Sequence, residues 1–200
     1  MAASKIIQHK IILKDEGSSF FRYGPAMSRL LSLVSEVKED IIVNTKIYTR
    51  HPLRYIPMYA ALKGGGAITL GNKSWSSITY TENFFSTDKD YFGRAAYGDN
   101  LLVWIRLSAH EVIHLNHAHR FKSFIIYLLV FAYQYMRYGH DGAPLEKEAN
   151  EGPRVLANFI HSIRREFNKD LLQDCLAANL TEDQKLIMID HWWGEFNKEP

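Results

Sequence analysis

The sequence predicts an α+β fold in which a short mixed or antiparallel sheet precedes a largely helical C-terminal half. Up to about residue 81, short apolar runs are separated by turn residues, a pattern typical of strands. From residue 101 onward, apolar residues recur at the three- and four-residue spacing of helices. The length of 200 residues suits a sizeable core, so we expect residues 1–200 to form a single domain.

The composition is that of an ordinary globular protein. Hydrophobic residues make up 46% and charged residues 23%, and the net charge is +2. A charge balance this close to neutral does not suggest a nucleic-acid or membrane-surface partner. The single cysteine, Cys175, excludes an internal disulfide and a cysteine-type zinc site. Residues Met1–Lys5 lack the apolar core of a signal peptide, so we expect a chain that is cytoplasmic as synthesised, or exported without a cleaved signal.

The predicted sheet consists of short strands separated by turns and one helix. Gly24-Pro25 is a typical helix start, and apolar residues at helical spacing extend that helix to about Val37. Pro52, Pro57 and a run of three glycines interrupt the chain farther on. The predicted strands are residues 5–14, 41–48, 67–70 and 77–81.

The C-terminal half is predicted to be helical. Helices are expected from residue 101, over about 122–138, from Pro144, and throughout residues 156–200, where Thr181-x-x-Gln184 forms a capping box. The longest apolar run, Phe124–Met136, is 13 residues long, whereas a bilayer span needs about 20. We therefore expect a buried helix there and no membrane span.

A metal-binding pattern lies inside the helix that starts at residue 101. Residues His110-Glu111-Val112-Ile113-His114 form an H-E-x-x-H sequence flanked by apolar residues. Residues i and i+4 of a helix share one face, so two imidazoles can hold one Zn²⁺ there. Glu111 can then act as general base on the water that the metal activates. Hydrolysis also requires a third ligand and an open coordination position.

The third ligand does not follow the H-E-x-x-H-x-x-G-x-x-H pattern. His117 occupies the glycine place and Arg120 the place of the last histidine, so we expect His117 and His119 to be solvated, or at most to touch a ligand. A later helix offers Glu146 and Glu148, which point about 200° apart, so that only one can face the metal. Taken alone, two glutamates at a helix N-terminus are explained by the helix dipole.

The motifs together resemble a known family. His110-Glu111-x-x-His114, a long helix and then Glu146-x-x-Ala149-Asn150 resemble gluzincin metallopeptidases, which carry Glu-x-x-Ala-Asp on the glutamate helix. Asn150 stands where that family has aspartate. The segments Ala67–Asn72 and Tyr138–Glu146 further resemble small gluzincin-like domains of bacterial contractile injection systems and polymorphic toxins. The resemblance covers about residues 45–155.

The resemblance implies a fold and a ligand set. It implies a small zincin fold over about residues 45–155, with an active-site helix, a glutamate helix and a C-terminal extension over 156–200. Glu146 is implied as the third zinc ligand beside His110 and His114, with Glu148 and Asp141 as alternatives. It also implies that the strand near Ile78–Thr81 lines the cleft, where a peptide substrate adds by backbone pairing.

The implied activity is that of a zinc metallopeptidase acting on a protein or peptide. Glu111 is expected to be the general base, and Tyr138, His140 and Arg137 are candidates to stabilise the oxyanion. Such a domain can be a secreted effector or toxin with a cognate immunity protein. The alternatives are a non-catalytic, metal-stabilised structural or interaction domain and an amidase acting on a non-protein amide. The presence of Glu111 favours an enzyme, because a structural zinc site needs no base.

Overall fold

The computed structural model describes residues 11–14, 16–48, 67–80, 101–121, 123–167 and 170–198. Over these ranges the chain is α+β, with a five-stranded mixed sheet and more helix than strand, as predicted. Residues 5–10 of the first predicted strand and Thr81 of the last lie outside the described residues.

The sheet has the strand order β1-β2-β3-β5-β4. Strands β3 and β5 run parallel, and the other neighbours are antiparallel. Strands β4 and β5 form a hairpin in which Ala67 pairs with Tyr80, and β4 is an edge of the described sheet. The strands are β1 (Ile12–Lys14), β2 (Phe21–Tyr23), β3 (Lys46–Tyr48), β4 (Ala67–Asn72) and β5 (Trp75–Tyr80).

The predicted strand over residues 41–48 is wrong in its first half. Residues Glu39–Asn44 form helix α3, and only Lys46–Tyr48 is a strand. Glu39 and Asp40 occupy the first turn of α3, where the helix dipole favours acidic side chains. Strand β2 was not predicted, because three residues are too few to show the alternation of a strand.

The prediction that a peptide pairs with the strand near Ile78–Thr81 is also wrong. Strand β5 lies between β3 and β4 and pairs with both of them. Its backbone groups are therefore used within the sheet along Ser77–Thr79, and no further strand can be added there. The outer neighbour β4 holds the edge position instead.

The remaining helices follow the predicted order. The chain continues from α5 into α6, α7 and α8 without an intervening strand. Helix α10 begins with the predicted capping box, in which the Gln184 amide donates to Thr181 Oγ1 and the Thr181 amide to Gln184 Oε1. Their bounds are α2 (Pro25–Ser35), α5 (Leu101–Arg120), α6 (Phe124–Tyr138), α7 (Pro144–Ala149), α8 (Glu151–Phe167), α9 (Leu171–Ala177) and α10 (Glu182–Phe196).

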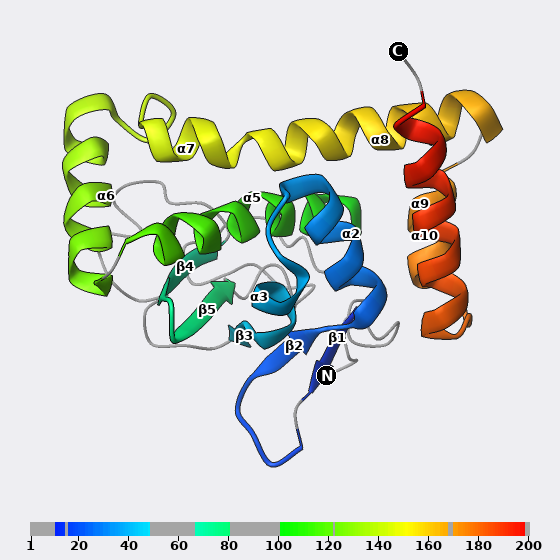
Figure 1. Cartoon of the computed structure of the whole chain (residues 1–200), viewed down its shortest axis with the longest axis horizontal. Helices are drawn as coiled ribbons and strands as arrows, with labels where there is room; N and C mark the ends of the chain where they lie inside the picture. The colour runs from blue at the N-terminus through cyan, green and yellow to red at the C-terminus, as the bar shows by residue number, and fades with distance from the viewer. Residues whose placement is uncertain are drawn as a thin grey trace, which may run out of the picture.

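Helix α5 is the centre of the fold. Figure 1 shows it between the sheet and the long run formed by α7 and α8, and it contacts β4, α7 and α8. Because both sides of α5 are covered, its apolar residues join the sheet to the C-terminal helices in one core. Fully buried members of this core include Leu30, Ile47, Ile78, Trp104, Ile105, Val112, Phe159 and Ile189.

A buried polar network connects α5 to the sheet. The Tyr80 hydroxyl lies 2.6 Å from the Tyr23 hydroxyl and 2.8 Å from Ser108 Oγ. Burial raises the pKa of both tyrosines, so both stay neutral. Because Ser108 lies two residues before His110, these hydrogen bonds help to fix the rotation of α5 and hence the direction of the histidines.

Helix α6 was predicted to be buried, and that prediction is wrong. Tyr127 is its one buried residue, while a broad apolar face is open to solvent. Figure 1 shows α6 standing at one end of the molecule, where neighbours cover one side of it. No helix among the described residues is long and apolar enough to cross a membrane. The exposed apolar face comprises Ile125, Ile126, Leu128, Leu129, Tyr133 and Met136.

Gly152 sets the distance between α8 and α5. A Cβ atom at Gly152 would lie 2.5 Å from the Ala109 carbonyl oxygen, closer than atoms can approach. Gly152 is buried in the first turn of α8, directly after the α7 segment. The absence of a side chain therefore lets the α7–α8 run lie against the turn of α5 that includes Ala109.

We expect Gly152→Ala to lower the free energy of unfolding by about 1–3 kcal/mol, because the new methyl group meets fixed backbone. Gly194→Ala is the matched control, since Gly194 is exposed in α10 and a Cβ there meets nothing within 4 Å. That change should raise stability by about 0.5–1 kcal/mol through helix propensity. Urea unfolding measures both; equal effects of the two substitutions would contradict the close packing.

Candidate metal centre

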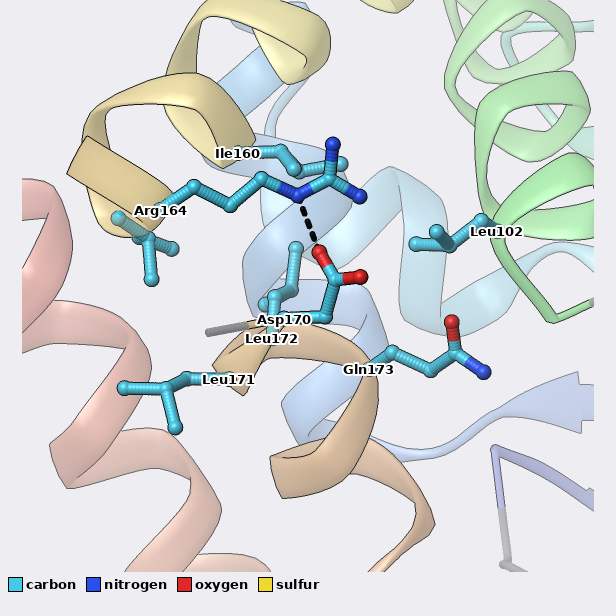
Figure 2. Close-up of a pocket in the computed structure, with 8 residues that line it drawn as sticks. Leu102, Ile160, Arg164, Asp170, Leu171, Leu172 and Gln173 are labelled. Carbon is cyan, nitrogen blue, oxygen red and sulfur yellow. Dashed lines mark hydrogen bonds and ion pairs between the residues drawn. The ribbon is translucent and has the colours of Figure 1, made fainter. Parts of the chain in front are cut away.

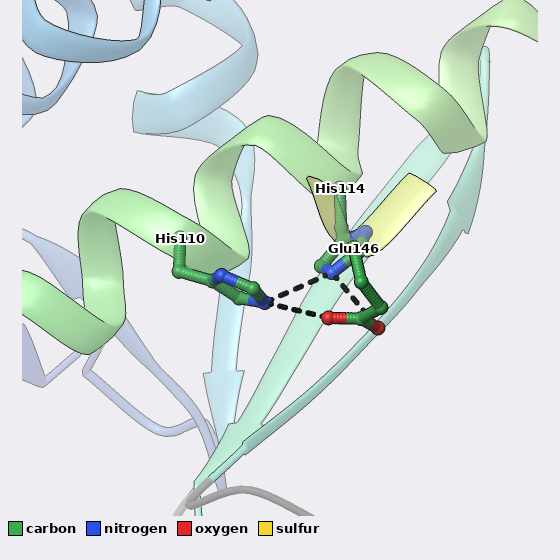
Figure 3. Close-up of side chains that lie close together, drawn as sticks. All are labelled: His110, His114 and Glu146. Atoms are coloured by element: carbon green, nitrogen blue, oxygen red, sulfur yellow. Dashed lines mark hydrogen bonds and ion pairs between the residues drawn. The ribbon is translucent and has the colours of Figure 1, made fainter. Parts of the chain in front are cut away.

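Helices α5 and α7 bring His110, His114 and Glu146 together. Figure 3 shows the two imidazoles, one turn apart on α5, pointing toward the Glu146 carboxylate. His110 Nε2 lies 3.2 Å from His114 Nε2 and 3.1 Å from Glu146 Oε2, and His114 Nε2 lies 3.6 Å from Glu146 Oε1. One ligand atom from each residue lies within 4.8 Å of the others, so the three can hold a metal ion.

The turn between α6 and α7 reverses the chain, so that Glu146 on α7 lies beside α5. Gly139 ends α6 with a φ of 70°, a left-handed conformation that glycine adopts without strain. Pro144 then occupies the first turn of α7, where its missing N–H costs no hydrogen bond. The Leu145 amide donates to Gln134 Oε1 at 3.0 Å, which ties the start of α7 to α6.

The cluster attracts positive charge. Burial opposes ionisation of Glu146, but His110 and His114 outweigh it and hold the pKa of that carboxyl below its ordinary value. Burial likewise opposes a charge on His110, but Glu146 and Glu111 outweigh it and raise the pKa of that imidazole. Both shifts mean that the site favours a cation beside the carboxylate, whether that cation is a proton or a metal.

The hydrogen bonds around the cluster fit a metal ion. His110 Nδ1 lies 3.1 Å from Asn150 Oδ1, a carbonyl oxygen that can only accept, so the proton of a neutral His110 sits on Nδ1. Its Nε2 then presents a lone pair toward Glu146. With that proton on Nδ1, His110 Nε2 has none to donate to Glu146 Oε2 at 3.1 Å, and this buried oxygen has no other hydrogen-bond partner among the described residues. A lone pair facing an unsatisfied carboxylate oxygen is stabilised by a cation between them.

Glu111 is buried beside the cluster but is not part of it. The Thr69 hydroxyl donates to Glu111 Oε2 at 2.6 Å and approaches the Glu111 carbonyl oxygen at 3.1 Å. Thr69 lies on the buried face of the edge strand β4. The contact therefore fixes the carboxylate predicted to be the general base from the sheet side of α5.

His117 is buried, so the prediction that it is solvated is wrong, and it contacts His114, one of the predicted ligands. Its Nδ1 lies 3.2 Å from His114 Nδ1, and its Nε2 lies 3.0 Å from Glu148 Oε2. Burial, with His114 acting in the same direction, lowers the pKa of His117 to about 4. His117 is therefore neutral at neutral pH. His119 is partly buried.

The two alternative third ligands lie elsewhere. Glu148 turns toward His117 and Arg120, and its side chain is 48% exposed. Asp141 is fully exposed, and its carboxylate accepts from His140 Nδ1 at 3.0 Å. Among the described residues, the cluster with metal-binding geometry takes its carboxylate from Glu146.

The candidate oxyanion donors differ in position. His140 Nε2 lies 3.6 Å from Glu146 Oε2, so the structure brings this side chain to the cluster. Tyr138 is half-exposed, and its ring stacks with the Arg137 guanidinium at 5.5 Å. Within the described residues, no contact joins Tyr138 or Arg137 to the three ligands.

Two residues of the site, Thr69 and Phe131, were not predicted from the sequence. Thr69 alternates with buried Ala67 along β4, which indicates an inward side chain, but nothing in the sequence pairs it with Glu111. Phe131 packs its ring edge-on at 6.0 Å from His114 and makes an apolar wall. Its helical spacing from Tyr127 was the available signal.

A hollow lies near the C-terminal end of α8, away from the cluster, and differs from the cluster in chemistry. Figure 2 shows aliphatic side chains around an ion pair between Arg164 and Asp170. Leu102 and Ile160 line it together with the start of α9. Because its charged groups already neutralise each other, this hollow lacks the convergent, unsatisfied groups of the metal centre.

Comparison with protein-family models, with curated proteins and with solved structures finds no match to this chain.

We expect the purified protein to bind one divalent metal ion per chain. His110→Ala, His114→Ala and Glu146→Ala should each weaken binding by more than the roughly 100-fold that loss of an outer hydrogen-bonding partner costs. Glu151→Ala is the control, because Glu151 is an exposed carboxylate paired with Arg154. Isothermal titration calorimetry measures the affinities. Retention of full affinity in both histidine variants would remove the site from this position.

Proposed function

We propose that this protein is a zinc-dependent metallopeptidase. The observation that carries the proposal is the placement of Glu111, which is buried beside three convergent ligands yet held outside them by Thr69. A metal site that only stabilises a fold needs no separate carboxylate of this kind. The arrangement therefore favours catalysis over a structural or interaction domain.

The donor set supports zinc as the metal. Two imidazoles and one carboxylate are typical of catalytic zinc sites, which keep a fourth position for water or substrate. Zinc held by His110, His114 and Glu146 would supply a Lewis acid and would lower the pKa of water from about 15.7 to about 7.

Glu111 is proposed to move the proton. Thr69 occupies its Oε2, which leaves Oε1 to take a proton from the attacking water and to deliver it to the leaving amine. Of the candidate oxyanion donors, His140 is the one beside Glu146; because its Nδ1 already donates to Asp141, it can donate from Nε2 only when both ring nitrogens carry a proton. Phe131 and the buried Tyr127 limit water on the α6 side of the cluster.

The sheet edge supports a peptide as substrate. Strand β4 is an edge of the described sheet and carries Thr69, so its outer backbone lies close to the general base. An extended peptide can pair with such an edge and place its amide beside the metal centre. An effector or toxin role, with a cognate immunity protein, stays a prediction from the resemblance. An amidase acting on a non-protein amide is the alternative reaction.

We expect Glu111→Gln to keep zinc affinity and to lose hydrolysis by about 10²–10⁴-fold, because the base is removed and no ligand is. Zinc-loaded protein is incubated with a peptide library, and new termini are counted by mass spectrometry. Glu151→Gln, which removes the same charge at an exposed site, should cleave like the wild type.

Full activity of Glu111→Gln would refute the general base. A wild type that binds zinc but leaves the library intact would refute the peptidase proposal, and a parallel digest of non-protein amides would then test the amidase alternative.

Thr69→Val should slow cleavage by about tenfold or more without changing zinc affinity. The substitution keeps the side-chain shape but removes a hydrogen bond to a buried carboxylate, and about 1.4 kcal/mol in the barrier is tenfold in rate. Thr69→Ser is the matched control, because it keeps the hydroxyl group and should keep most of the activity. If the valine and serine variants show the same kcat, the proposed positioning of Glu111 is wrong.

A further inference from the structure

We propose that His117 and Glu148 form a relay that positions His114, holding its proton on Nδ1 and directing its Nε2 to the metal. The inference rests on the proposed zinc centre and assigns a role to two residues outside its ligand set. His117 and Glu148 are positioning residues in this arrangement, since neither reaches the cluster formed by His110, His114 and Glu146.

The relay is a continuous line of polar contacts. It runs from His114 Nδ1 to His117 Nδ1 at 3.2 Å, from His117 Nε2 to Glu148 Oε2 at 3.0 Å, and from that oxygen to Arg120 Nη2 at 3.2 Å. Its inner members are buried, with His114 4% and His117 1% exposed. The outer pair of Glu148 and Arg120 reaches the surface.

The nitrogen that carries the proton in each histidine of the relay follows from Glu148 at its outer end. Glu148 Oε2 is a carboxylate oxygen and can only accept, so His117 Nε2 carries the proton of that ring. The other nitrogen of a neutral His117 is then an acceptor, and His114 Nδ1 must be the donor toward it. His114 Nε2 is left with a lone pair, which is the form that binds a metal.

The two histidine ligands are thus oriented by different groups. His110 donates its Nδ1 proton to the neutral amide of Asn150, whereas His114 donates to an imidazole backed by a carboxylate. A carboxylate behind a histidine ligand raises the basicity of that ligand. The short helix α7 therefore contributes twice, with Glu146 toward the metal and Glu148 toward the relay.

A purely structural role makes a different prediction. If His117 and Glu148 only tie α7 to α5, their loss lowers stability without changing metal affinity beyond that effect. The relay instead predicts a loss of zinc affinity in folded protein. It also predicts one tautomer for His117, with the proton on Nε2, which a structural tie does not require.

The principal test is Glu148→Ala, because the exposed position of Glu148 makes a folding failure the least concern. Zn²⁺ affinity is measured by competition with a chromophoric chelator on the full chain. We expect a fall of about ten- to hundredfold, the range usual for partners of metal ligands. Glu151→Ala is the matched control, since it also removes an exposed carboxylate paired with an arginine, and its affinity should equal that of the wild type.

His117 variants and a spectrum complete the test. His117→Phe fills the space without an acceptor and should bind zinc about ten- to hundredfold more weakly. His117→Gln can accept and donate at once and should recover part of that loss. Nitrogen-15 spectra of the imidazoles in the zinc-loaded wild type should show His117 protonated on Nε2.

The relay is refuted by any of the following outcomes. Wild-type affinity in Glu148→Ala and His117→Phe, or a proton on Nδ1 of His117, refutes the relay and leaves the zinc centre standing. Equal weakening in Glu148→Ala and Glu151→Ala shows a general charge effect and refutes it also. If His117→Phe does not fold, Glu148→Ala decides. A wild type that binds no zinc refutes the proposed function itself, and the relay with it.

Discussion

The meeting of two imidazole nitrogens and one carboxylate oxygen is the interaction on which the site depends. Three electron-rich atoms within 4.8 Å of one another repel unless a positive charge lies among them. The raised pKa of His110 and the lowered pKa of Glu146 have the same cause, because both shifts favour a positive charge beside the carboxylate. The fold therefore holds these groups together against a repulsion that a bound cation would relieve.

Packing around α5 supplies that restraint. Gly152 lets α8 approach the carbonyl of Ala109, so the glutamate helix that precedes α8 is held against the histidines. On the opposite side, Ser108 and Glu111 are hydrogen-bonded to Tyr80 and Thr69 of the sheet. Helix α5 is thus fixed from both sides, and rigid support of this kind is what precise ligand geometry requires.

The elements packed around α5 contribute different groups to the site. The sheet side holds Glu111 through Thr69, which lies on the edge strand of the described sheet. The α7 side holds Glu146 and, one turn further along α5, the contact between His117 and Glu148. The α6 side contributes Phe131 and an apolar outer face, which adds a wall to the cluster but no ligand.

The sequence by itself determined what depends on local spacing. The four-residue spacing of His110 and His114 on one helix face, Pro144 at the start of α7 and the capping box of α10 follow from helix geometry. Sequence also placed Asn150 beside the predicted ligand, without showing that it would contact His110.

Tertiary structure decided whatever depends on partners distant in the chain. Strand β5 became an inner strand because β3 pairs with it across a long connection, which local alternation cannot reveal. Residues 41–44 became helical, and α6 kept an exposed apolar face, because burial depends on which elements arrive beside a segment. The choice of Glu146 over Glu148 was settled in the same way: both lie on α7, and only the direction in which that helix meets α5 decides which carboxylate reaches the histidines.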